Sequence, residues 1–130
     1  MSRGALDIRL KRAYESPASS DGFRLLVDRL WPRGLSREGA KLDEWDKELA
    51  PSTELRKWFG HEPSRFEEFR LRYIDELRGQ RPALSGLRRR ARERRLTLVF
   101  SAKDTEHNDA VVLLEVLKRG LPRKARGLDG

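Results

Sequence analysis

The chain has 130 residues, a net charge of +8 and no cysteine. This length fits a single domain that needs no metal or disulfide to fold. The lack of cysteine excludes disulfides, zinc–thiolate and iron–sulfur sites, and a thiol nucleophile. Residues 1–13 hold no apolar run of signal-peptide length, and no segment approaches the roughly 20 apolar residues of a membrane helix. We therefore expect a soluble cytoplasmic protein without membrane association.

Two strands are predicted near the N-terminus. Residues 8–14 alternate polar and apolar side chains, and residues 23–30 are apolar on both faces for much of their length. Residues 15–22 are rich in Ser, Pro, Asp and Gly, which indicates a loop. A connection of about eight residues favours a hairpin over a helical crossover. The connection length alone does not settle whether these two strands are parallel or antiparallel.

The middle of the chain is predicted to be helical. Pro32 and Gly34 end the second strand, and Ser36 can cap a helix over residues 36–49. That helix would place Leu42, Trp45 and Leu49 on one face. Further helices are predicted from Ser52 to Gly60, over 63–78 and over 82–95.

A buried strand is predicted over 96–101, followed by a helix that starts at Asp104 or Thr105 and runs to about Leu117. Together these elements predict an α/β fold in a single layered domain over residues 7–118. Its small, mainly parallel central sheet of about three strands would be surrounded by five or so helices. Residues 1–6 and 119–130 are predicted to be flexible basic termini.

Two polar loops follow predicted strands, Asp28–Gly34 and Ala102–Asn108. Ligands of open α/β sheets bind beyond the carboxyl ends of the strands, so these loops form the candidate site. Candidate catalytic residues are Asp28, Asp104 and His107. Asp28 can act as a general base or orient one. His107 would lie in the first turn of the last helix, whose dipole favours a neutral imidazole.

Each of these residues also has a purely structural interpretation. Asp28 can pair with a nearby cation, Asp104 can cap a helix, and His107 can occupy a surface position. No metal or cofactor is predicted, because the two histidines, His61 and His107, are not closely spaced. The glycine patterns of phosphate loops and dinucleotide-binding turns are absent. Ser101 lacks the flanking glycines of a nucleophile elbow.

A second candidate surface comes from charge alone. An arginine-rich segment near the end of the fourth predicted helix suggests a nucleic-acid-binding face, with candidates Arg88, Arg89, Arg92 and Arg95. The alternative interpretation is a solvated helix face. The position of this helix relative to the two loops distinguishes these interpretations. A nucleic-acid ligand becomes attractive only if the helix and the two loops lie on the same face of the protein.

Four segments resemble the bacterial YeaO-like family, a family of domains of unknown function: Asp28–Leu35 (DRLWPRGL), Leu49–Ser52 (LAPS), Leu55–His61 (LRKWFGH) and Ala102–Asp104 (AKD) with His107-Asn108. The resemblance covers about residues 7–118. It implies a compact α/β fold and a cytoplasmic bacterial protein, without an established reaction. Longer relatives look parallel at the first two strands and carry a cysteine–histidine pair near His107, whose thiol chemistry does not transfer to this chain.

The positions that match the family's motifs extend the candidate site. Its ligand-binding candidates are Arg29, Trp31, Arg33, Arg56, Trp58, His61, Lys103 and Asn108. Acid, base and cation together suit a small anionic ligand, such as a phosphate or nucleotide. The first hypothesis is therefore an enzyme or enzyme-derived pocket for such a ligand, and the alternative is a nucleic-acid-binding module. Neither enzymatic activity nor oligomeric state follows from the sequence.

Overall fold

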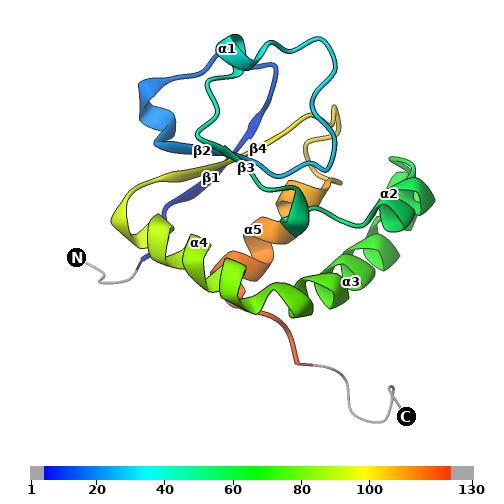
Figure 1. Cartoon of the computed structure of the whole chain (residues 1–130). Helices are drawn as coiled ribbons and strands as arrows, with labels where there is room; N and C mark the ends of the chain where they lie inside the picture. The colour runs from blue at the N-terminus through cyan, green and yellow to red at the C-terminus, as the bar shows by residue number, and fades with distance from the viewer. Residues whose placement is uncertain (1–4, 124–130) are drawn as a thin grey trace.

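The computed structural model of the protein describes residues 5–123, which form an α/β fold around a four-stranded parallel sheet (Figure 1). The strand order is β1 (Ile8–Arg12), β4 (Leu96–Phe100), β2 (Phe23–Leu26) and β3 (Glu44–Trp45). The predicted fold class is confirmed. The short strand β3 adds a fourth strand to the three that were expected.

The first two strands do not pair with each other, so the hairpin that the short connection favoured is wrong. Both pair in parallel with β4, with Ile8 and Phe23 each opposite Leu96. Strand β4 can occupy this central position because all five of its residues are buried. Between β1 and β2 the chain must return across the sheet, and it then turns sharply at Gly22, which has a φ of +68°. A Cβ atom there would lie 2.3 Å from the carbonyl oxygen of Arg95, so only glycine fits.

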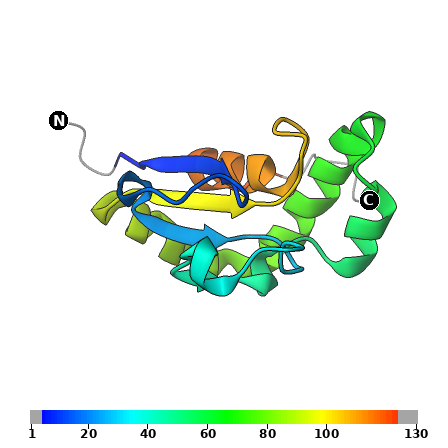
Figure 2. The same ribbon diagram turned by 90° about the horizontal axis from the view of Figure 1, so that it is seen from above.

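The helices on either side of β4 in the sequence pack against one face of the sheet, and the helices before them continue this layer beyond the strand ends (Figures 1 and 2). A short helix with its flanking loops lies on the other face. The larger core contains the fully buried Leu25, Leu98, Tyr73 and Leu113. The helices are α1 (Arg37–Ala40), α2 (Thr53–Phe59), α3 (Phe66–Leu77), α4 (Arg81–Glu93) and α5 (Asp109–Arg119). Short 3-10 helices occupy Ser19–Asp21, Lys47–Leu49, Pro63–Arg65 and Arg78–Gln80. None of the helices described is long and apolar enough to cross a membrane.

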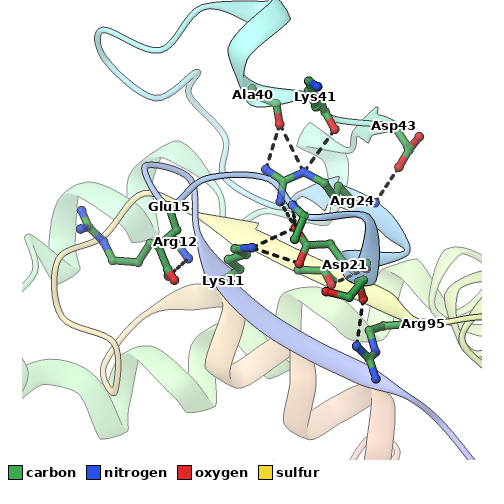
Figure 3. Close-up of polar contacts among 12 residues, drawn as sticks. Lys11, Arg12, Glu15, Asp21, Arg24, Ala40, Lys41, Asp43 and Arg95 are labelled. Carbon is green, nitrogen blue, oxygen red and sulfur yellow. Dashed lines mark hydrogen bonds and ion pairs between the residues drawn. The ribbon is translucent and has the colours of Figure 1, made fainter.

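A buried ion-pair cluster lies on the second face of the sheet, beneath α1 (Figure 3). Arg24, only 3% exposed, donates from Nη1 to the Asp21 carboxylate at 2.6 Å, and Lys11 Nζ donates to the same carboxylate at 3.0 Å. Burial alone would raise the pKa of Asp21, but the N–H of Ala18 and these two cations lower it below its usual range.

The same arginine attaches α1 to the sheet. Its guanidinium donates to the carbonyl oxygens of Ala40 and Lys41, where α1 ends. The cluster of Asp21, Arg24 and Lys11 therefore fixes the end of the segment that runs from β2 through α1 to β3. This segment includes the loop after β2, which forms one wall of the site described below.

Two predicted helices differ from the structure. The helix over 36–49 is wrong beyond Ala40, because Lys41 adopts a φ of +47° and Trp45 joins the edge strand β3. The last helix begins at Asp109 rather than at Asp104 or Thr105, because Asn108 is its cap and accepts from the N–H of Val111. Of the termini predicted to be flexible, residues 1–4 and 124–130 lie outside the described residues, and Arg119 belongs to α5.

Candidate functional site

A cavity of about 620 Å³ lies at the edge where the parallel strands end, a size typical of small-molecule sites. Its walls come from the ends of β1 and β4, the loop after β2, and helices α2, α3 and α5. The residues that line it are Arg12, Tyr14, Asp28, Arg29, Leu30, Trp31, Pro32, Arg33, Pro51, Arg56, Phe59, His61, Phe69, Ser101, Ala102, Lys103, Asn108 and Asp109. Both loops expected to form the site therefore contribute to a single cavity.

Most of the predicted site residues meet there. Those that line the cavity are Asp28, Arg29, Trp31, Arg33, Arg56, His61, Lys103 and Asn108. Trp58, Asp104 and His107 are not among the lining residues. The catalytic candidates are thus separated, with Asp28 in the cavity and the other two outside its wall.

Asp28 is held rigidly at the end of β2. One carboxylate oxygen, Oδ2, accepts from the N–H and the hydroxyl of Ser101, each at 2.8 Å. The Asp28 carbonyl oxygen accepts from the indole of Trp45 at 2.7 Å. The edge strand β3 and the end of β4 therefore position this side chain jointly.

Asp109, the first residue of α5, forms a carboxyl pair with Asp28. Burial raises the pKa of Asp109 well above its ordinary value, and the charge of Asp28 and a hydrogen bond with it raise it further. A helix N-terminus ordinarily favours a carboxylate, so the environment here outweighs the helix dipole. Asp109 therefore holds its proton to higher pH than an ordinary aspartate does, and such an altered carboxyl in a cavity is typical of functional sites.

Two cations of the cavity wall have structural partners. Arg12 donates to the carbonyl oxygens of Ser101 and Ala102, and Arg29 donates to those of Ala50 and Pro51. These bonds join β1 to the loop after β4, and the loop after β2 to the start of α2. Both arginines still contribute positive charge, although part of their donor capacity is occupied.

Three other cations of the wall have no such partners. The side chains of Arg33, Arg56 and Lys103 make no hydrogen bond or ion pair with any residue between 5 and 123. Arg33 and Lys103 are exposed, whereas the Nε atom of Arg56 is buried without an acceptor. An unsatisfied buried donor costs free energy, so a ligand with a hydrogen-bond acceptor would be stabilised most by contacting Arg56.

Asp104 and His107 form a small unit of their own in the loop before α5. The Asp104 carboxylate accepts from the N–H groups of Glu106 and His107, and its second oxygen lies 2.9 Å from His107 Nδ1. The Glu106 N–H, followed by the His107 side chain, lowers the pKa of Asp104. The His107 ring stands edge-on to Phe66, with centroids 5.1 Å apart. His107 precedes the helix instead of lying in its first turn, which corrects the expectation.

Several predicted binding residues also have clear structural contacts. Trp31 donates to the carbonyl oxygen of Leu35 and packs edge-on against Trp45. The guanidinium carbon of Arg72 lies over the ring of Trp58, 4.5 Å from the ring centroid. Asn108 uses its amide to cap α5 and to bond the carbonyl oxygen of Asp104.

The arginine-rich end of α4 lies away from the cavity. Helix α4 leads into β4, so its last turns lie at the edge where the strands begin, opposite the edge where they end (Figure 2). Arg88 donates to the carbonyl oxygens of Val116 and Leu117, and Arg95 bonds Asp7 and the carbonyl oxygen of Ser20. Of the four candidates, Arg89 and Arg92 remain exposed.

Sequence reasoning missed the residues that complete the acidic part of the cavity. The predicted helix start lies four or five residues before Asp109, so the sequence pattern does not place Asp109 at the helix N-terminus. The position of Ser101 after a strand suggests a nucleophile, whereas in the structure it donates to Asp28. No three potential metal ligands cluster within the described part of the chain.

The fold and the cavity define the class of protein: a parallel α/β domain with a polar site at the carboxyl ends of its strands. The chain belongs to the DUF488-N3i family, described as the inactive DUF488-N3 subclade, whose model matches residues 7–129.

Similar proteins confirm the predicted YeaO-like resemblance. The uncharacterized protein YeaO of Escherichia coli K12 is 46% identical over 113 residues, covering 87% of this chain and 98% of its own. The uncharacterized proteins Mb3100c of Mycobacterium bovis and Rv3073c of Mycobacterium tuberculosis H37Rv are each 39% identical over 110 residues, covering 85% of this chain and 92% of theirs. No solved structure gives a significant match.

Proposed function

We propose that the cavity at the strand ends binds a small anionic ligand through Arg56. The observation that carries this proposal is the lack of any acceptor for the buried Nε of Arg56, in a wall that also holds the unpaired Arg33 and Lys103. Five cationic side chains line the cavity, against the two carboxyl groups of Asp28 and Asp109. The positive charge of the wall therefore exceeds the negative and favours an anion.

The family description favours binding over turnover. The subclade is described as inactive, and His107 with Asp104 lies outside the cavity wall. A binding site without catalysis requires only the cations and the shape of the cavity. The proposed role is therefore an anion-binding protein built on the strand-end site of an α/β fold.

Replacing Arg56 with glutamine is expected to weaken binding of inorganic phosphate at least about tenfold, because one charge-assisted hydrogen bond is lost. Isothermal titration calorimetry of the full chain at low ionic strength measures this. Arg89→Gln is the matched control, since it removes one positive charge from an exposed position on α4. Failure of the wild-type protein to bind phosphate below millimolar concentrations, or equal losses in both variants, would contradict the proposal.

The nucleic-acid alternative rests on the net charge and on the exposed Arg89 and Arg92. Its support is weaker, because Arg88 and Arg95 bond within the protein and the helix end lies opposite the cavity. We expect no retained band in a gel shift with duplex DNA or RNA at physiological salt. A salt-dependent shift that disappears in the Arg89→Glu/Arg92→Glu variant would instead support this alternative.

A further inference from the structure

The cavity has room for far more than a phosphate. At about 620 Å³ it lies within the range of cavities that enclose drug-sized ligands, and a lone phosphate would leave most of it filled with water. Part of its wall is apolar, from Pro51 and from Phe59 and Phe69, whose rings stack with centroids 4.3 Å apart. Such a wall suits the flat, apolar body of a larger ligand.

The carboxyl pair restricts what can lie opposite it. Asp28 and Asp109 are hydrogen-bonded to each other, and Ser101 occupies Oδ2 of Asp28. The oxygens that these two carboxyl groups present to the cavity are hydrogen-bond acceptors, and they repel the oxygens of a phosphate. The ligand group facing this pair must therefore not be anionic and must carry N–H or O–H donors.

The cations have the opposite requirement. Arg56, the one guanidinium of the wall with a buried unsatisfied nitrogen, comes from α2, whereas the carboxyl pair comes from the end of β2 and the start of α5. No ion pair joins Arg56 to Asp28 or Asp109, so the two groups line one cavity without neutralising each other. A ligand that spans them needs an anionic end and a second end that is not anionic and carries N–H or O–H donors.

We propose that the ligand is a nucleoside monophosphate, an inference that rests on the proposed anion site. Its phosphate would lie at Arg56, and the edge of its base would lie at the Asp28–Asp109 pair. The amino and ring N–H groups of a base supply the donors that the pair requires. The aromatic base supplies the flat body that fits against the apolar wall. Arg33 and Lys103, both exposed, add charge for the phosphate from the rim of the cavity.

Calorimetric titration of the full chain with inorganic phosphate, ribose 5-phosphate, AMP, CMP, GMP and UMP tests this proposal. We expect at least one nucleotide to bind about tenfold more tightly than ribose 5-phosphate, because the base adds hydrogen bonds to a charged pair. Equal affinities for ribose 5-phosphate and all four nucleotides would overturn the nucleotide assignment and leave the anion site intact. Absence of binding by every compound would overturn both.

Two variants at one position test the role of the carboxyl pair. Asp109→Asn keeps a donor toward Asp28 and an acceptor toward the ligand, so nucleotide affinity is expected to stay within about threefold of wild type. Asp109→Leu has similar size but no acceptor, and nucleotide affinity is expected to fall about tenfold while phosphate affinity is unchanged. The unchanged phosphate affinity also shows that the leucine variant is folded. Nucleotide binding that is equal in both variants would overturn the assignment.

Discussion

Replacing Asp21 with alanine is expected to lower the free energy of unfolding by about 3–5 kcal/mol, the usual cost of breaking a buried ion pair by removing one partner. The Asp21 carboxylate accepts from Arg24, from Lys11 and from the N–H of Ala18. Its loss leaves the 3%-exposed Arg24 without its counter-charge. Urea denaturation followed by circular dichroism measures the change.

Asp7 provides a matched control for this prediction. It also pairs with two arginines, Arg9 and Arg95, but its side chain is 43% exposed. Exposed ion pairs contribute at most about 1 kcal/mol, so Asp7→Ala should cost far less than Asp21→Ala. If the two substitutions destabilise the protein equally, the cluster of Asp21, Arg24 and Lys11 does not support the sheet as we describe.

Replacing Asp109 with asparagine is expected to stabilise the protein at neutral pH by about 1–3 kcal/mol, the range for an unfavourably buried polar group. The pKa of Asp109 is raised in the folded state by its burial and by Asp28, so the folded protein holds this proton to higher pH than the unfolded chain does. The wild-type protein therefore loses stability as pH rises from the ordinary aspartate pKa of 3.8 toward the folded value. Asparagine cannot ionise and removes this loss.

Thermal unfolding of both proteins between pH 4 and pH 8 measures this effect. The stabilities should converge near pH 4 and separate as pH rises. Asp104→Asn is the control, from the loop that precedes α5, because the lowered pKa of Asp104 gives the opposite sign and no gain at neutral pH. A variant Asp109→Asn that is less stable than wild type at pH 7, or a difference that does not change with pH, would show that Asp109 is ionised in the folded protein.

Local patterns predicted most of the fold. Helices α2, α3 and α4 and strand β4 fall within a few residues of their predicted ranges, because their periodicity and terminating residues agree. The helix predicted over 36–49 failed for a tertiary reason. Trp45 fits a helical spacing, but it pairs beside β2 and donates to the carbonyl oxygen of Asp28.

Long-range contacts explain what could not be predicted. Nothing local indicates that β4 lies between β1 and β2, or that Arg24 within an apolar strand meets Asp21 from a Ser-rich loop. The position of the cavity did follow from the rule for parallel sheets, since both predicted loops line it. Its acidic pair did not, because Asp109 depends on where α5 begins.

We propose that this protein binds an anion in the strand-end cavity, and not at the arginine-rich end of α4. An NMR titration of the isotope-labelled chain with inorganic phosphate maps the site directly. We predict shifts in the amide signals of the cavity loops, around Asp28, Arg56, Ser101 and Lys103, with the Arg88–Arg95 signals unmoved. Shifts confined to the α4 residues, or no shifts at millimolar phosphate, would show that the cavity is not the anion site.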